Sequence, residues 1–192
     1  VTVHEFGHAL ACRQAGGQAN RIVLWPLGGV AYVNPPPRPG ATLWSIAAGP
    51  LVNVALVFVL GLLVLGARVV GDFYGTDIYA FMKAVFLINL LLLVFNILPI
   101  YPLDGGQILR SLLWFIIGPI RSLMAVAIIG FIGAAALILF ALFAQSVWIG
   151  AVAVFILLNC WGGLQQALML ARVAKAPPPL TDVPPDQLNI TQ

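Results

Sequence analysis

Five apolar segments, separated by shorter polar connections, dominate the pattern of hydrophobic and polar positions along the chain. A helix needs about 20 predominantly apolar residues to cross a bilayer. Four segments reach that length, whereas the first is expected to be the second half of a spanning helix in a truncated chain. The segments are residues 1–15, 42–66, 78–98, 123–144 and 147–170. The pattern therefore predicts an all-α polytopic membrane protein with about five transmembrane segments.

The connections predict further elements. Two β-branched and aromatic stretches, residues 21–25 and 30–33, flank a glycine-containing turn, which is typical of a short β-hairpin. Residues 107–117 predict a short helix that lies at the membrane interface or continues the third segment. The last two apolar segments are joined by a very short turn and are expected to pack as an antiparallel pair. We expect residues 1–175 to form one core and residues 176–192 to form a Pro-rich tail or linker.

Composition favours lipid as the surrounding solvent. Hydrophobic residues make up 61% of the chain and charged residues 8%, with a mean hydropathy of +1.04. A soluble domain is about half apolar and a quarter charged. The net charge is +3, but the basic residues are scattered, which argues against nucleic-acid binding. The two cysteines, Cys12 and Cys160, make no disulfide framework.

The distribution of basic residues predicts an orientation in the membrane. Most of them fall on the side reached at the end of the first segment, whereas Arg68 and Lys83 fall on the other side. Cytoplasmic connections are enriched in Lys and Arg. We therefore expect the first side, including the C-terminus, to face the cytosol. The basic residues of that side are Arg13, Arg21, Arg38, Arg110, Arg121, Arg172 and Lys175.

The two histidines and the single glutamate of the chain all lie in the segment His4-Glu5-Phe6-Gly7-His8. Residues four apart share one face of a helix, so both imidazoles can reach one metal ion. The glutamate beside them can act as general base toward a water that zinc acidifies, as in the zincin signature. Ionisable groups are costly in an apolar helix and are usually functional there. The motif therefore predicts a catalytic zinc site near the cytosolic end of the first segment.

A catalytic zinc ion usually has three protein ligands, so a third must come from elsewhere. Cys12 lies about 12 Å from His4 along a regular helix, too far to share one ion. Asp104 alone among the aspartates follows the broken end of a spanning segment on the same side as the motif. With Gln107, Asp104 also fits a capping box, so capping and ligation both stay open, and the need for a ligand favours ligation. The other carboxylates are Asp72, Asp77, Asp182 and Asp186.

These residues resemble the site-2 protease family of intramembrane zinc metalloproteases, in its branch with compact cores. Residues 4–8 are similar to the zinc-binding helix of the family, and residues 96–106 to its Asn-x-x-Pro-x-x-Pro-x-Asp-Gly motif. Residues 48–53 resemble the Ala-Gly-Pro-x-x-Asn start of the intervening helix. Residues 26–30 resemble a membrane-associated β-element. The matches follow the order of the family over residues 1 to about 110.

The resemblance implies that His4, His8 and Asp104 bind one zinc ion and that Glu5 is the general base. Asn96 would position the substrate or an intermediate near zinc, although an amide that packs helices is an equal alternative. Strand addition to the hairpin would bind an unwound substrate segment, the alternative being a purely structural hairpin. The residues expected to contact substrate are Asn96, Gly28, Gly29 and Val30.

The expected function is that of a zinc endopeptidase that cuts within or near a transmembrane segment of a membrane-protein substrate. Its partners are then the lipid bilayer and that substrate. The alternative is a non-catalytic membrane protein, either a metal-binding scaffold or a metal transporter. A transporter needs polar ligands along successive helices, but outside the two motifs the apolar segments are nearly bare of carboxylates and contain no histidine.

Overall fold

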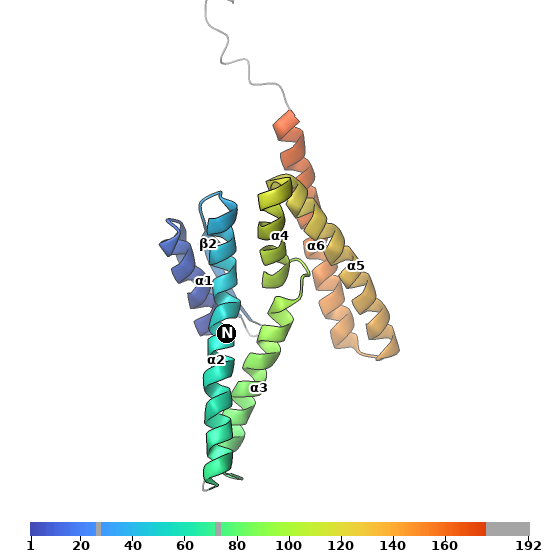
Figure 1. The fold of residues 1–192 in the computed structure, drawn as a ribbon. Helices are drawn as coiled ribbons and strands as arrows, with labels where there is room; N and C mark the ends of the chain where they lie inside the picture. Colours follow the sequence, from blue (N-terminus) through green and yellow to red (C-terminus); the bar gives the residue numbers. More distant parts are fainter. Residues whose placement is uncertain (26–27, 72–73, 176–192) are drawn as a thin grey trace, which may run out of the picture.

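The computed structural model describes residues 1–25, 28–71 and 74–175, which form six helices and one two-stranded sheet (Figure 1). In chain order, these elements are α1 (Thr2–Gln14), β1 (Gln18–Trp25), β2 (Gly28–Asn34), α2 (Pro39–Val70), α3 (Asp77–Ile97), α4 (Asp104–Ile117), α5 (Pro119–Phe143) and α6 (Val147–Lys175). The predicted tail, residues 176–192, lies outside the described residues.

Four helices, α2, α3, α5 and α6, are long and apolar enough to cross a membrane. Large apolar side chains point away from the protein along them. Phe58 is 69%, Phe81 70% and Phe143 89% exposed. Such surfaces are unfavourable in water and are matched by lipid. The predicted all-α membrane architecture is thus confirmed. The first predicted span, α1, has only 13 residues in this chain.

Several helices begin earlier than the sequence predicts; α5, for example, begins at Pro119 rather than at residue 123. Helix α2 begins at Pro39 rather than at residue 42, because proline in the first helical turn has a suitable φ and loses no hydrogen bond there. The segment containing Gly49 and Pro50 therefore lies inside α2 and not at its start. Helix α4 begins at Asp104 rather than at residue 107. The earlier start of α4 brings Asp104, Gly105 and Gly106 of the second motif into regular helix.

The predicted β-hairpin is present and its strands are longer than predicted. Strands β1 and β2 pair antiparallel, with Ile22 opposite Ala31 and Leu24 opposite Gly29. Strand β2 has β1 on one side only. Both strands also contact α1. The hairpin is therefore held against the helix that carries the histidines and the glutamate.

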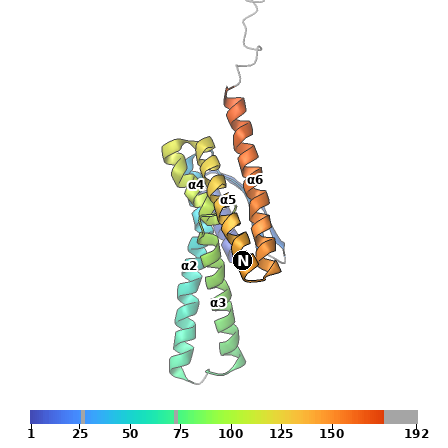
Figure 2. The ribbon, with the colours of Figure 1, turned by 90° about the vertical axis from the view of Figure 1, so that its right-hand side faces the viewer.

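The helices form two groups. Helix α1 packs against the hairpin and α2, and α2 packs against α3. Helices α5 and α6 form an antiparallel pair, and α4 contacts both α2 and α5. Figures 1 and 2 show α2 and α3 running side by side and extending beyond the α5–α6 pair. Small buried residues such as Ala134 and Cys160 lie in the α5–α6 interface, where they allow close approach of helices in a membrane. Helix α4 therefore links the two groups.

Candidate active site

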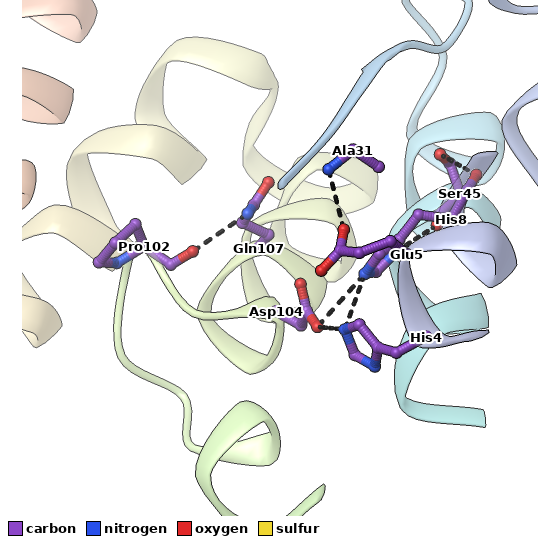
Figure 3. A network of polar contacts seen from close by, with 8 residues as sticks. All are labelled: His4, Glu5, His8, Ala31, Ser45, Pro102, Asp104 and Gln107. Carbon is purple, nitrogen blue, oxygen red and sulfur yellow. Dashed lines mark hydrogen bonds and ion pairs between the residues drawn. The ribbon is translucent and has the colours of Figure 1, made fainter. Parts of the chain in front are cut away.

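His4, His8 and Asp104 lie face to face, although the hairpin and helices α2 and α3 separate them along the chain (Figure 3). The Asp104 Oδ2 atom is 3.0 Å from His4 Nε2 and 3.4 Å from His8 Nε2. The two Nε2 atoms are 3.1 Å apart. Both histidines are buried. Two imidazole nitrogens and one carboxylate oxygen from distant parts of the chain thus face one another.

A backbone carbonyl sets the orientation of the His8 ring. His8 Nδ1 lies 2.9 Å from the Ser45 carbonyl oxygen on α2. A carbonyl oxygen only accepts hydrogen bonds, so Nδ1 carries a proton, and in the neutral ring the lone pair is then on Nε2. That lone pair is directed toward Asp104 and His4. A metal-binding histidine is usually oriented by such a hydrogen bond from its other nitrogen.

Two glycines allow the motif face of α1 to pack closely on α2. A Cβ atom at Gly49 would overlap the His8 ring and lie 2.9 Å from His4 Cε1. A Cβ atom at Gly7 would lie 2.9 Å from the Ala48 carbonyl oxygen. Neither position accepts a side chain without displacing its neighbours. The imidazoles therefore occupy space that Gly49 leaves free.

The first turn of α4 directs Asp104 toward the histidines. Its N-cap residue is Leu103, and no side chain caps the helix. Gln107 Nε2 instead donates a hydrogen bond to the Pro102 carbonyl at 3.1 Å. The capping box considered from the sequence is therefore not formed. A Cβ atom at Gly106 would lie 2.5 Å from the backbone of the preceding loop, so this turn can form only with glycine there.

The three residues fit a zinc ion. One ligand atom of each lies within 4.8 Å of the others, and two histidines with one carboxylate are a donor set of catalytic zinc sites. Asp104 begins α4, which is not one of the four candidate membrane spans, so its carboxyl group lies outside those spans. Burial alone would raise the pKa of Asp104, but hydrogen bonds and charge from His4 and His8 outweigh it and hold that pKa below its usual value. An ionised carboxylate suits a cation.

Glu5 lies beside this group and is tied to the hairpin. Its Oε2 atom accepts a hydrogen bond from the Ala31 backbone N–H at 2.8 Å (Figure 3). A Cβ atom at Gly29 would lie 2.6 Å from Glu5 Cγ and 2.9 Å from Oε1. Glu5 is 6% exposed. Strand β2 thus holds the carboxylate by a backbone hydrogen bond and leaves room for it at Gly29.

A cavity of about 640 Å³ opens onto His4, Glu5, His8 and Asp104. Several residues expected to contact substrate also line it, namely Asn96, Gly29 and Val30. Gly28 is the first residue of β2. The sequence reasoning missed two cavity residues of α6, Phe155 and Asn159. The sequence signal that could have identified Asn159 is a polar amide within an apolar span.

The other candidates for the third ligand take no part in this group as far as the structure describes them. Asp77 begins α3, and Asp72, Asp182 and Asp186 lie outside the described residues. Cys12 is buried, and its thiol contacts the Gln18 carbonyl. Among the described residues, the group of potential metal ligands consists of His4, His8 and Asp104.

The sequence of the chain matches a known protein family. The model of peptidase family M50 matches residues 1–73 and 65–140. A zinc metalloprotease of Methanocaldococcus jannaschii is 34% identical over 81% of this chain and 44% of its own length. A putative zinc metalloprotease of Synechocystis sp. is 35% identical over 62% of this chain and 30% of its own length. The chain thus spans less than half the length of these relatives.

A solved structure agrees with the sequence relatives. The site-2 protease from Methanocaldococcus jannaschii superposes with a TM-score of 0.65 at 31% identity, covering 85% of this chain and 73% of that one. The family match covers both the histidine motif and Asp104. The chain therefore belongs to peptidase family M50, and its resemblance to the site-2 proteases is confirmed.

Proposed function

We propose that this chain forms the catalytic core of a zinc metalloprotease that hydrolyses a peptide bond within or near a transmembrane segment of a membrane protein. The observation that carries the proposal is the position of Glu5, whose carboxylate lines the same cavity as the three candidate zinc ligands. A protein that only binds metal does not need a proton acceptor there. The M50 relatives named as zinc metalloproteases support this conclusion.

The roles of the residues follow from their chemistry. His4 and His8 would bind zinc through Nε2, and Asp104 through a carboxylate oxygen. Bound there, zinc supplies Lewis acidity toward a water molecule and the substrate carbonyl. Glu5 takes a proton from the attacking water and passes it to the amine of the leaving product. The hydrogen bond from Ala31 keeps the Glu5 carboxylate oriented for both transfers.

The hairpin is suited to bind an extended substrate. A helical segment hides its peptide bonds in the helix, so the segment must unwind before it can be cut. Strand β2 pairs with β1 on one side and lines the cavity through Gly29, Val30 and Ala31. An extended segment could add to its other edge. The Asn96 amide, which also lines the cavity, would hydrogen-bond the backbone of that segment.

Hydrolysis needs water at the depth of the membrane. The chain between α3 and α4 is irregular and contains Pro99 and Pro102, and non-helical backbone is tolerated at that depth where it lines a cavity. Arg38, Arg121 and Arg172 lie in helix ends that Figure 1 shows at one end of the molecule. By the enrichment of basic residues in cytoplasmic connections, that end faces the cytosol. The cavity is then hydrated from the cytosolic side.

The proposal is tested with Glu5→Gln in the intact protein, reconstituted in lipid vesicles with a membrane-spanning substrate. Glutamine keeps the hydrogen-bond acceptor but cannot take the proton. We expect zinc content to stay unchanged and cleavage to fall by about 10²- to 10⁴-fold, the usual contribution of a general base. Gln14→Ala is the matched control, because Gln14 lies exposed at the end of the same helix and pairs with Trp44.

Normal cleavage by the Glu5→Gln protein would eliminate the proposed mechanism. If neither the wild-type protein nor the variant cleaved any membrane-spanning substrate while both bound zinc, the metal-binding scaffold would be the better description. Transport of zinc into the vesicles, without cleavage of substrate, would favour the transporter.

A further inference from the structure

The two histidines differ in the environment of the nitrogen that faces away from Asp104. His8 Nδ1 donates to the Ser45 carbonyl. His4 Nδ1 is buried and has no hydrogen-bond partner among the described residues. A ring that binds metal through Nε2 carries its proton on Nδ1, and that proton almost always has an acceptor. The site therefore lacks one acceptor beside His4.

A second buried polar group on α2 is also unsatisfied. The Asn53 side chain is 0% exposed, and neither its Oδ1 nor its Nδ2 has a partner among the described residues. Its backbone carbonyl does have one, because Asn89 Nδ2 of α3 donates to it at 3.0 Å. A buried amide without hydrogen bonds is costly. The hydrogen bond from Asn89 satisfies the Asn53 backbone carbonyl. It leaves the Asn53 side-chain amide without a partner among the described residues.

The packing of α1 on α2 places His4 against the face of α2 that carries Asn53. His8 contacts Ser45, and His4 Cε1 is 2.9 Å from the Cβ position of Gly49, so the two helices run antiparallel. Asn53 follows Gly49 by one helical turn and lies on the same face. Side chains on a helix lean toward its N-terminus. The Asn53 amide therefore leans back along α2 toward Gly49 and the His4 ring.

We propose that Asn53 is a positioning residue for His4 in the metal-loaded site, where the His4 Nδ1–H donates a hydrogen bond to Asn53 Oδ1, so that the two atoms left without partners here satisfy each other. This bond fixes the tautomer that directs the His4 Nε2 lone pair toward Asp104 and the metal. Each histidine then has its own acceptor on α2, the Ser45 carbonyl for His8 and the Asn53 amide for His4. The inference rests on the zinc site of the proposed function but not on proteolysis.

Zinc affinity tests the proposal, measured by competition with a chelator on the purified full-length protein in detergent. We expect Asn53→Leu, which keeps the size of the side chain, to bind zinc about 10- to 100-fold more weakly, as for other partners of metal-binding histidines. Asn53→Asp restores an acceptor and should bind zinc as tightly as the wild type. Asn89→Leu is the control, because it removes the α2–α3 hydrogen bond without touching the acceptor.

A spectroscopic measurement keeps the test independent of variant stability. The chain has two histidines. Within it, the ¹⁵N-histidine NMR spectrum of the zinc-loaded wild type therefore reports only His4 and His8. We expect both Nδ1–H protons to be protected from exchange, and Asn53→Leu to expose only one of them. The protected one that remains belongs to His8, which is bonded to Ser45.

Three results would overturn the inference. One is unchanged zinc affinity in Asn53→Leu. Another is an equal loss in Asn53→Leu and Asn89→Leu, which would mean that Asn53 acts only in helix packing. The third is rapid exchange of one Nδ1–H proton in the zinc-loaded wild type. A wild type that binds no zinc would instead refute the metal site itself, and the inference would fall with it.

Discussion

Glu5 and Ala31, 26 residues apart in the chain, are joined by a hydrogen bond of 2.8 Å from the backbone amide to the carboxylate. The bond couples the candidate general base on α1 to the strand that lines the cavity. It also occupies a donor of β2 that an added substrate strand could otherwise use. The position of β2 and the orientation of Glu5 are therefore interdependent.

Gly29→Ala should reduce catalysis without reducing zinc binding. The new Cβ atom would lie 2.6 Å from Glu5 Cγ and 2.9 Å from Oε1, so the carboxylate must move. Misplacement of a catalytic group by about 1 Å can cost roughly 10²-fold in rate. Steady-state cleavage and metal content measure the two effects. Gly40→Ala is the control, because the nearest atom to its Cβ position is 3.8 Å away. Full activity in Gly29→Ala would show that Glu5 does not need this position.

Gly49→Ala should prevent zinc binding. Its Cβ atom would overlap the His8 ring and lie 2.9 Å from His4 Cε1, so both imidazoles would be displaced. We expect at least the roughly 10- to 100-fold loss of affinity seen when outer partners of metal ligands are changed. Metal content and chelator competition measure it. Gly66→Ala lies in the same helix with no atom within 4 Å of its Cβ position and should bind zinc normally. Wild-type affinity in Gly49→Ala would contradict the packing described above.

Asp104→Ala should remove zinc from the purified protein, because the carboxylate is the expected third ligand and faces both imidazoles. The loss should be at least as large as that of an outer partner, about 10- to 100-fold. Gln107→Ala tests whether any change in the first turn of α4 has this effect, since Gln107 bonds the Pro102 carbonyl in that turn. It should keep the metal. Stoichiometric zinc in Asp104→Ala would rule out ligation by this residue.

Phe58→Lys should impair membrane integration. Phe58 is 69% exposed and lies well inside α2, where a lysine facing lipid costs about 2.5–3.5 kcal/mol on insertion scales. Val69→Lys is the matched control, because Val69 is 77% exposed but lies at the end of the same helix beside Arg68. Its lysine can reach the interface. The membrane-integrated fraction of each variant measures the difference. Equal integration would argue against lipid contact at Phe58.

Features that depend on local periodicity could be predicted from the sequence. The spacing of His4 and His8 places them on one helix face, and the lengths of the apolar segments identify the four spanning helices. The β-branched stretches around the glycine-containing turn identify the hairpin. Each of these signals lies within a single element, so it does not require knowledge of how the elements pack.

Features that depend on packing between distant elements could not be predicted. Nothing local to Gly49 indicates that two imidazoles will lie against it, because that contact depends on how α1 crosses α2. The hydrogen bond from Ala31 to Glu5 depends on how the hairpin folds back. Asn159 reaches the cavity only because α6 returns beside it. For Asp104, the same sequence fits both a helix cap and a ligand; the fold shows that no side chain caps α4 and brings the carboxylate to the imidazoles.

The order of the candidate ligands along the chain has a consequence for biosynthesis. His4 and His8 are made first, whereas Asp104 emerges from the ribosome only after the hairpin, α2 and α3 have been synthesised. A nascent chain therefore presents two of the three ligands throughout the insertion of those helices. If these three residues hold the metal, its stable binding must wait for α4, so the site cannot be complete before α2 and α3 have been synthesised.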